Sequence, residues 1–316
     1  MRTTTRTTRL AGLAAVAIAA LALTACSPEA PSGDGSDSSA APEAGVTYED
    51  IVNGGPVADD ADVEANAWAS AVREAGVLKV GGTETSELFS LLDPTTNTAK
   101  GFDAGISQLL SRYILGDVKT ELQQVTVDTR ESLLESNTVD TVIATYSITP
   151  ARAERIAFAG PYYTSQAAIL VKKDNTDITS LADLAGKTVA TQANSTGVAL
   201  LEAEAPEAEI LALPDHAQAL AAVQQGNADA YVIDQTLLLN AVIAGDDVKI
   251  VGEPFGPEDR YGIGVNKTSD AVDFINDFLT KIEEDGTWAK LWTVTIGDRA
   301  GLTDVPQPPT PGDTGL

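Results

Sequence analysis

Residue types that build disulfides and most metal sites are nearly absent from this chain. Its 316 residues include one cysteine and one histidine. A single cysteine excludes an internal disulfide and any cysteine-based metal cluster, and a single histidine excludes the multi-histidine metal sites. We therefore expect no metal and no cofactor. The histidine, His216, follows the helix-capping Asp215 and is interpreted as a surface or capping residue.

Basic residues are also scarce. The chain has 20 Lys and Arg against 46 Asp and Glu, which gives a net charge of −26. A protein this acidic repels phosphate backbones, so nucleic-acid binding is not expected. The sequence contains no GxSxG, HExxH, Walker or GxGxxG motif, and so offers no recognised catalytic signature.

The first 25 residues read as a secretion signal. Three arginines in the first nine residues precede an uncharged apolar run, Leu10–Leu23, which is shorter than the roughly 20 residues that span a bilayer. Small residues and then Cys26 follow this run, as in the bacterial lipoprotein processing box, which the segment resembles. The resemblance implies that Cys26 becomes a lipidated N-terminus on the extracytoplasmic face of the cell membrane. A free cysteine beyond an ordinary cleavage site is the alternative.

Residues 26–62 are predicted to be a flexible acidic tether. From residue 27 the segment holds nine acids and no Lys or Arg, is rich in Ser, Pro, Gly and Ala, and shows no apolar periodicity before Trp68. Residues 301–316 are expected to form a similar short, Pro-rich tail.

Between these ends, apolar spacing alternates between strand and helix periods. It predicts helices over 102–115, 129–137 (with Asp128 as N-cap), 196–204, 215–225 and 271–282, a final helical turn at 288–292, and strands over 77–82, 119–127, 141–145, 166–173, 188–191, 229–233 and 261–265. Strands that alternate with helices indicate an α/β protein with a largely parallel sheet, and about 230 residues suit two lobes.

One segment combines several groups that bind carboxylates. In Asp140–Arg152 a predicted strand ends, small hydroxyl residues follow, and an arginine lies one turn into the next helix. Hydroxyls, free backbone N–H groups and a guanidinium would then converge at a helix start, where a carboxylate finds its donors. The alternative is a surface arginine on an amphipathic helix.

Two further strand ends carry polar residues. Ser195 and Thr196 follow the strand over 188–191 and, taken alone, favour a well-capped helix. Asp234 ends the strand over 229–233, where it is either an N-cap or the partner of an ammonium group.

Taken in order, eight segments resemble the polar amino-acid family of solute-binding proteins of ABC importers, which have the type II periplasmic-binding fold. They are GVLKVGG, GFD, TYSITPAR, FAGPYY, SLADLAGKTVATQANST, GNADAYVID, YGIGVNK and DGTW. The TPGD tail adds a likeness to glutamate-binding lipoproteins. This resemblance implies two lobes, each a mostly parallel sheet flanked by helices, with crossings near 164–168 and 254–260. Lobe 1 would comprise 63–166 and 257–300, and lobe 2 would comprise 167–256.

The resemblance also implies a ligand site between the lobes. It assigns the ligand α-carboxylate to hydroxyls and an arginine of lobe 1, with Ser195 and Thr196 closing on it from lobe 2 beside Gln192. The implied residues are Arg130, Thr145, Ser147, Arg152, Gln192, Ser195, Thr196 and Asp234. Asp234 would hold the α-ammonium, and Arg130 would hold a side-chain carboxylate unless it pairs with Asp128 or Glu131.

Two acids work against an acidic ligand in this interpretation. Glu84 and Glu87 fall in the lobe 1 loop that contacts the ligand side chain in the family, and near the cleft they would favour a neutral or basic ligand. Gly105 also replaces the second acid of the family's GFDxD segment.

The implied function is that of a monomeric, non-enzymatic binding protein. It would capture a polar amino acid by hinge closure, with glutamate or aspartate favoured and glutamine next, and deliver it to a membrane permease with its ATPase. The alternatives are an enzyme of the same fold that dehydrates cyclic carboxylates, and a sensor that presents its closed state to a receptor.

Overall fold

A computed structural model describes residues 45–316. The predicted signal and Cys26 lie outside the described residues. The helices are α1 (Tyr48–Gly54), α2 (Asp60–Ala65), α3 (Ala67–Ala75), α4 (Phe102–Leu115), α5 (Arg130–Glu135), α6 (Pro150–Arg155), η1 (Leu181–Leu184), α7 (Thr196–Glu204), α8 (His216–Gln225), α9 (Gln235–Ile243), α10 (Ala271–Glu284), α11 (Thr287–Trp292), η2 (Thr293–Gly297) and α12 (Asp298–Ala300). Among residues 45–316, no helix has the length and apolarity needed to cross a bilayer.

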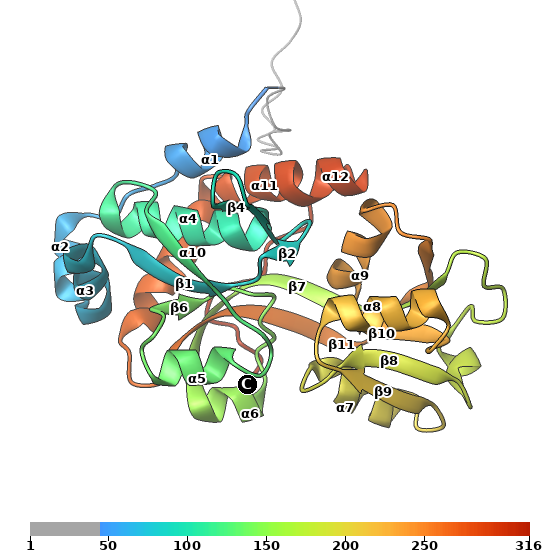
Figure 1. Cartoon of the computed structure of the whole chain (residues 1–316). Helices are drawn as coiled ribbons and strands as arrows, with labels where there is room; N and C mark the ends of the chain where they lie inside the picture. Colours follow the sequence, from blue (N-terminus) through green and yellow to red (C-terminus); the bar gives the residue numbers. More distant parts are fainter. Residues whose placement is uncertain (1–44) are drawn as a thin grey trace, which may run out of the picture. The chain divides into compact units, whose positions relative to one another are not determined.

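Eight strands form one sheet in the order β5-β1-β6-β11-β7-β10-β8-β9 (Figure 1), and three more form a small antiparallel sheet. β1 pairs in parallel with β5 and β6, and β8 pairs in parallel with β9 and β10. The predicted α/β class with a mostly parallel sheet is therefore confirmed. The strands are β1 (Leu78–Gly82), β2 (Thr85–Ser86), β3 (Ser90–Asp93), β4 (Thr98–Lys100), β5 (Thr120–Gln124), β6 (Thr141–Val142), β7 (Ile156–Lys172), β8 (Thr188–Gln192), β9 (Glu209–Leu213), β10 (Ala230–Asp234) and β11 (Val248–Asn266).

Two long antiparallel strands, β7 and β11, connect the halves of the sheet and lie side by side in Figure 1. β11 pairs with β6 through Gly264, and β7 pairs with β10 from Ala167 onward. We call the half with β5, β1 and β6 lobe 1, and the half with β10, β8 and β9 lobe 2. Both expected crossing segments lie within these strands, whose pairing shifts register between Val251 and Asp259.

Each lobe has its own apolar core. In lobe 2 the side chains of β7 alternate, so that Ala168 and Leu170 join one buried cluster and Ile169 and Val171 join the other. This period of two covers the sheet of lobe 2 on both faces. Lobe 1 has a larger cluster around α4, α10 and α11 and a smaller one around Tyr146.

The N-terminal part of the described chain is folded where a tether was predicted. Thr47 and Asp50 form a capping box at the start of α1, and Ile51 and Val52 are buried. α1 packs against α4 and α11, and Val63 of α2 is also buried. The tether prediction is therefore wrong from Thr47 to residue 62, because helices this short bury too few residues to produce a visible apolar period.

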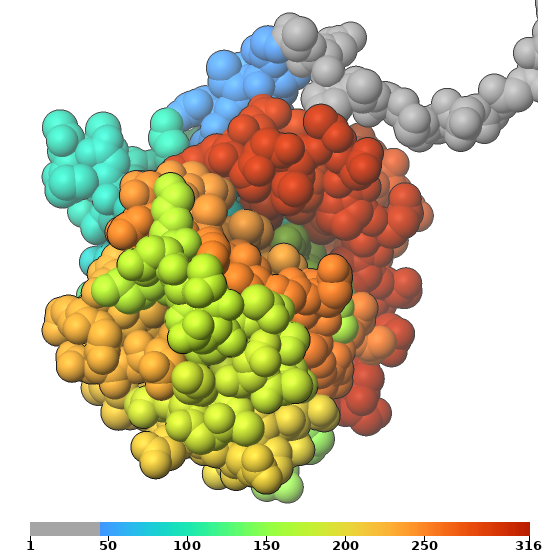
Figure 2. Space-filling model, turned by 90° about the vertical axis from the view of Figure 1, so that its right-hand side faces the viewer, coloured from blue at the N-terminus to red at the C-terminus, as the bar shows by residue number. Residues whose placement is uncertain are grey.

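The C-terminal tail is also held in place, although it was expected to resemble the tether. The backbone N–H of Gly312 donates to the carbonyl of Gly160 at 2.8 Å, and Arg260 donates to the Asp313 carboxylate at 3.0 Å. Figure 2 shows the red C-terminal residues along one side of the molecule. The tail therefore contacts both long strands, β7 and β11.

Candidate functional site

A cavity of about 280 Å³ lies between lobe 1 and lobe 2, at the ends of strands and the starts of helices. Every residue that the family resemblance assigns to ligand binding lines it, four from each lobe: Arg130, Thr145, Ser147, Arg152, Gln192, Ser195, Thr196 and Asp234. The structure thus brings together residues that are more than 100 positions apart in the sequence. Their role in ligand binding stays a prediction.

Arg152 is fixed between the lobes. Thr149 caps α6 and accepts the backbone N–H of Arg152, which sets the side chain one turn into the helix. Its Nη1 donates to the Ser147 carbonyl at 2.8 Å, and its Nη2 donates to the Asn194 carbonyl of lobe 2 at 3.3 Å. Because the side chain is only 11% exposed, the alternative of a surface arginine is wrong.

Arg130 begins α5 and is 4% exposed. Its guanidinium lies 3.8 Å from the ring centroid of Tyr146, its Nη1 has one long bond of 3.5 Å to the Ala144 carbonyl, and its Nε has no hydrogen-bond partner. Burial, with the neighbouring Arg152, lowers the pKa of Arg130 to about 10. A buried cation with unused N–H donors is a strong binding site for an anion, whose oxygens accept those hydrogen bonds.

Glu131 is the acid nearest to this arginine pair. Its Oε1 lies 3.9 Å from the Nε atoms of both Arg130 and Arg152, and it accepts the Tyr146 hydroxyl at 2.6 Å. At 3.9 Å neither contact is a hydrogen bond, so Glu131 balances charge without using up the guanidinium donors. Asp128 neither pairs with Arg130 nor caps the helix as expected, because its carboxylate accepts Asn194 Nδ2 from lobe 2 at 2.6 Å.

Thr145 adopts a left-handed backbone conformation, with φ of +42°. Its N–H donates to Asp103 Oδ2 at 2.8 Å, and the Tyr162 hydroxyl donates to Asp103 Oδ1 at 2.7 Å. Burial raises the pKa of Asp103 to about 7. The acid of the GFD segment therefore supports the strained turn that faces the cavity.

On the lobe 2 side, Asp234 is 6% exposed and accepts the Tyr261 hydroxyl at 2.9 Å. Asp234 occupies the N-cap position of α9, as one alternative predicted, but its side chain makes no capping hydrogen bond to the helix. Burial and the neighbouring carboxylate of Asp259 raise the pKa of Asp234 well above its ordinary value.

Asp259, which the sequence interpretation missed, receives two hydroxyl groups. Ser147 Oγ donates to its Oδ2 from lobe 1 at 3.1 Å, and Thr196 Oγ1 donates to the same atom from lobe 2 at 3.0 Å. Both hydroxyls were assigned to the ligand carboxylate, yet here a protein carboxylate accepts them. Ser195 serves as the cap of α7, accepting Gly197 N and donating to the Gln192 carbonyl.

His216 also lines the cavity, which differs from its interpretation as a surface residue. Its Nδ1 lies 3.2 Å from the Tyr231 hydroxyl, and burial lowers its pKa. The position does follow the cap Asp215, as predicted. His216 is the first residue of α8 and reaches the cavity from there, a placement that an amphipathic period alone does not indicate.

Glu84 and Glu87 do not line this cavity. The lobe 1 loop contributes Thr83, Thr85 and Ser86 instead. Glu87 pairs with Arg299, and Glu84 lines a different cavity. The acidic loop therefore does not oppose an acidic ligand as the sequence suggested.

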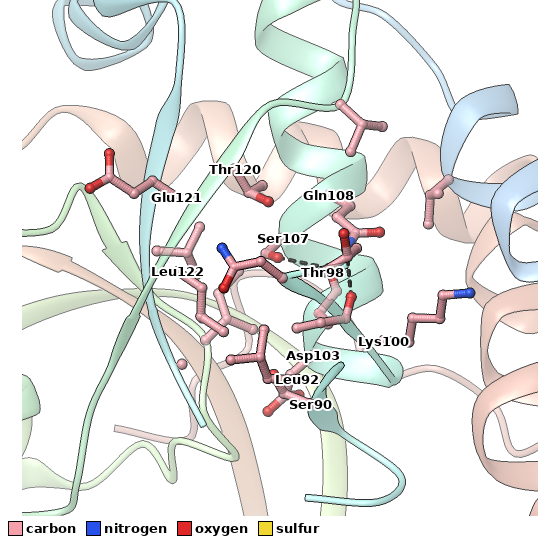
Figure 3. A pocket seen from close by; sticks show the side chains of 18 of the residues that line it. Ser90, Leu92, Thr98, Lys100, Asp103, Ser107, Gln108, Thr120, Glu121 and Leu122 are labelled. Carbon is pink, nitrogen blue, oxygen red and sulfur yellow. Dashed lines mark hydrogen bonds between the residues drawn. The ribbon is translucent and has the colours of Figure 1, made fainter. Parts of the chain in front are cut away.

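That other cavity has a volume of about 550 Å³ and lies within lobe 1, between α1, α4, β4 and β5. Figure 3 shows Gln108, Ser107 and Asp103 reaching toward it from α4, with Glu121 on the opposite side. Lys100 at its edge pairs with Glu49 of α1. Lobe 1 alone builds this cavity, whereas the cavity of about 280 Å³ is lined by residues of both lobes and contains every predicted site residue.

Several known proteins are similar to this chain in sequence or in fold. The glutamine-binding protein of Geobacillus stearothermophilus is 35% identical over 198 residues, which cover 62% of this chain and 75% of that protein. The glutamate-binding protein GluB of Corynebacterium efficiens is 30% identical over 265 residues, covering 80% and 88%. The solute receptor for L-cysteine of Neisseria gonorrhoeae has the same fold, with a TM-score of 0.70, 24% identity, and coverage of 75% and 97%.

Residues 78–294 match the family of bacterial extracellular solute-binding proteins, family 3. The matched segment begins at β1 and ends in η2, and it contains both lobes and every residue of the candidate site. The chain therefore belongs to the bacterial extracellular solute-binding proteins of family 3.

Proposed function

We propose that this protein binds a polar amino acid between its lobes and delivers it to the membrane permease of an ABC importer. The cavity offers opposite charges at its two sides, with Arg152 on lobe 1 and Asp234 on lobe 2. An α-amino acid carries a carboxylate and an ammonium on one carbon and needs both partners when buried. The relatives named above for glutamine and glutamate binding support this class of ligand.

For the ligand itself, we propose glutamate or aspartate. The observation that carries this choice is Arg130, a buried guanidinium whose Nε has no hydrogen-bond partner and whose Nη1 has only a 3.5 Å bond. A side-chain carboxylate would receive charge-assisted hydrogen bonds there. Glu84 and Glu87, the acids that opposed this choice, line no part of the cavity.

Glutamine is the second candidate. Glu131 lies 3.9 Å from both arginines and offsets part of their charge, which favours a neutral side chain. Calorimetric titration of residues 45–316 with glutamate, aspartate, glutamine, asparagine, arginine and histidine tests both proposals. Tight binding of glutamate or aspartate supports the role of Arg130, and a preference for glutamine moves specificity to Glu131. Binding of none of the six would contradict the importer function.

An enzyme of the same fold remains the alternative from another class. A dehydratase would use a cleft carboxyl as general acid, and Asp234, whose pKa is raised by burial and by Asp259, is the group that could donate. Incubation with a prephenate-like substrate tests this directly, since product formation would favour the enzyme. A sensor that signals through a receptor is distinguished by neighbouring genes, because permease and ATPase genes favour the importer.

We further propose that the protein is a lipoprotein attached through Cys26 outside the cytoplasm. The processing box at residues 23–26 supports this, as does the extracellular family to which the body belongs. A Cys26→Ser variant should leave the cell for the medium, because the acyl chains supply the membrane affinity. Retention of that variant on the membrane would contradict lipid anchoring.

A further inference from the structure

Tyr261 lies on β11, opposite Tyr163 of β7. Its side chain is fully buried and belongs to the main apolar cluster of lobe 1. The ring stacks on Tyr163, with ring centroids 5.7 Å apart, and makes an edge contact with Phe89. Packing of this kind from lobe 1 leaves the ring little freedom to change its position.

The hydroxyl at the end of this ring contacts lobe 2. It donates to Asp234 Oδ2 at 2.9 Å, and Thr236 Oγ1 lies 2.9 Å from the same hydroxyl. Because the single proton of the phenol goes to Asp234, Thr236 must donate to Tyr261. Within residues 45–316, no other side-chain hydroxyl, amide or backbone N–H donates to the Asp234 carboxylate. The orientation of a carboxylate that lines the cavity therefore depends on one hydroxyl that is held from lobe 1.

The backbone of Tyr261 is joined to the opposite side of the cavity. Tyr261 forms an isolated β-bridge with Ser147, and the N–H of Gly262 donates to the Tyr146 carbonyl at 2.9 Å. Arg152 in turn donates to the Ser147 carbonyl at 2.8 Å. One residue of β11 is thus connected through its backbone to the arginine side of the cavity and through its hydroxyl to the aspartate side.

We propose that Tyr261 is a positioning residue for the ligand ammonium, because its hydroxyl fixes the Asp234 carboxylate relative to Arg152, which we assign to the ligand α-carboxylate. This inference rests on the proposed function, since it requires an amino-acid ligand. An α-amino acid carries both charges on one carbon, so their separation is fixed and the two partners must match it. A carboxylate that is already oriented loses no rotational freedom when the ammonium binds. Tyr261 itself does not line the cavity and acts through Asp234.

The hydroxyl also supports the charge that an ammonium needs. Burial and the neighbouring Asp259 raise the pKa of Asp234. The Tyr261 hydroxyl acts in the opposite direction, as does Arg152 of α6. Burial and the two nearby acids keep the Tyr261 phenol neutral by raising its pKa, so its proton stays available for the carboxylate. Removal of the hydroxyl should therefore weaken ligand binding most at low pH, where Asp234 is hardest to ionise.

The experiment is titration calorimetry of the whole protein with L-glutamate and L-glutamine, on the wild type and on Tyr261→Phe, at pH 6 and at pH 8.5. Phenylalanine keeps the ring in the core of lobe 1 and removes only the hydroxyl. We expect the affinity for the amino acid that the wild type binds to fall roughly thirtyfold at pH 6 and by a smaller factor at pH 8.5. The dependence on pH distinguishes an effect on the Asp234 carboxylate from a general loss of packing.

Tyr113→Phe is the matched control. Tyr113 is buried in the same apolar cluster, packs against Phe274 and lines no part of the cavity, so its variant should bind with wild-type affinity. A second variant, Thr236→Val, removes the hydroxyl that donates to Tyr261 and keeps the shape of the side chain. We expect it to bind roughly threefold more weakly at pH 6. Circular dichroism establishes which variants are folded.

The outcomes separate the two claims. If the wild type binds neither amino acid, the proposed function and this inference both fail. If the wild type binds and folded Tyr261→Phe matches its affinity, this inference fails and the proposed function stands. An equal loss at both pH values would assign Tyr261 a structural role only and would also overturn the inference. If Tyr261→Phe does not fold, Thr236→Val decides, since a loss that is larger at pH 6 supports the inference and wild-type affinity overturns it.

Discussion

The carboxylate of Asp103 accepts the backbone N–H of Thr145 at 2.8 Å and thereby connects helix α4 to the wall of the cavity between the lobes. Thr145 needs this support because its φ of +42° is unfavourable for a threonine. Asp103 holds a carboxylate in the core, with only Tyr162 and Thr145 as donors. Conformational strain at the site is thus balanced by a buried acid outside it.

This relationship predicts a pH-dependent stability. The pKa of Asp103 rises from an ordinary 3.8 to about 7, so between these values the folded state holds a proton that the unfolded state releases. The contribution of Asp103 to the free energy of unfolding is therefore greatest below pH 4. It falls by about 4 kcal/mol as the pH rises to 7 and does not change further above pH 7.

Urea denaturation from pH 4 to pH 8 checks this prediction. The stability difference between wild type and Asp103→Asn should shift in favour of the variant as the pH rises. Asp93→Asn is the control, because the N–H of Thr95 lowers the pKa of exposed Asp93 and its contribution is lost only as the pH falls. A wild-type and Asp103→Asn difference that is constant across this range would contradict the burial of a titrating acid.

Arg152→Ala and Asp234→Ala should each abolish measurable amino-acid binding. Removing one partner leaves a ligand charge buried without compensation, which costs about 3–5 kcal/mol. Isothermal titration of each variant measures the loss. Arg155→Ala serves as control, since this neighbouring arginine pairs with Glu135 at an exposed position. Near-normal affinity in either site variant would disprove our assignment of the site.

Arg130→Gln should change the preference between glutamate and glutamine without abolishing amino-acid binding. We expect glutamate affinity to fall roughly a hundredfold and glutamine affinity to change little, because only the acidic side chain needs the positive charge. The ratio of the two dissociation constants is the measurement. Equal losses for both ligands would show that Arg130 supports the fold of the cavity rather than the ligand side chain.

Ile51→Ala should destabilise the protein by about 2–4 kcal/mol, although it lies in a segment that looked like a tether. Ile51 is 4% exposed and belongs to the main core of lobe 1, so its removal leaves a cavity. Thermal or urea unfolding measures the effect. Glu64→Ala, at an exposed position of α2, should leave stability unchanged. An unchanged midpoint for Ile51→Ala would mean that α1 does not pack as described.

Helices with clear end signals could be predicted from the sequence. The helix over 102–115 coincides with α4, because Gly116 stops it in a left-handed conformation, and the helix over 196–204 coincides with α7, because Ser195 caps it. For the long strand β11, the sequence predicts only residues 261–265. Its middle contains glycine, proline and charged residues without a period of two, and its pairing with β7 alone makes it a strand.

The residues of the candidate site were also predicted only in part from the sequence. The family motifs identified Arg152, Asp234 and the other predicted residues that line the cavity, because those motifs lie at strand ends. Asp259 carries no such signal, since it lies in the irregular part of β11 and its meaning comes from contacts with Ser147 and Thr196. Pairings between segments more than 60 residues apart are tertiary information that a local pattern does not contain.

The N-terminal helices have a consequence for how the protein works when it is held at that end. α1, α2 and α3 pack on lobe 1, and their buried side chains belong to its core. An attachment at the start of the chain would therefore restrain lobe 1. In the function we propose, hinge closure would then move lobe 2 relative to a stationary lobe 1, and the permease would contact one moving lobe.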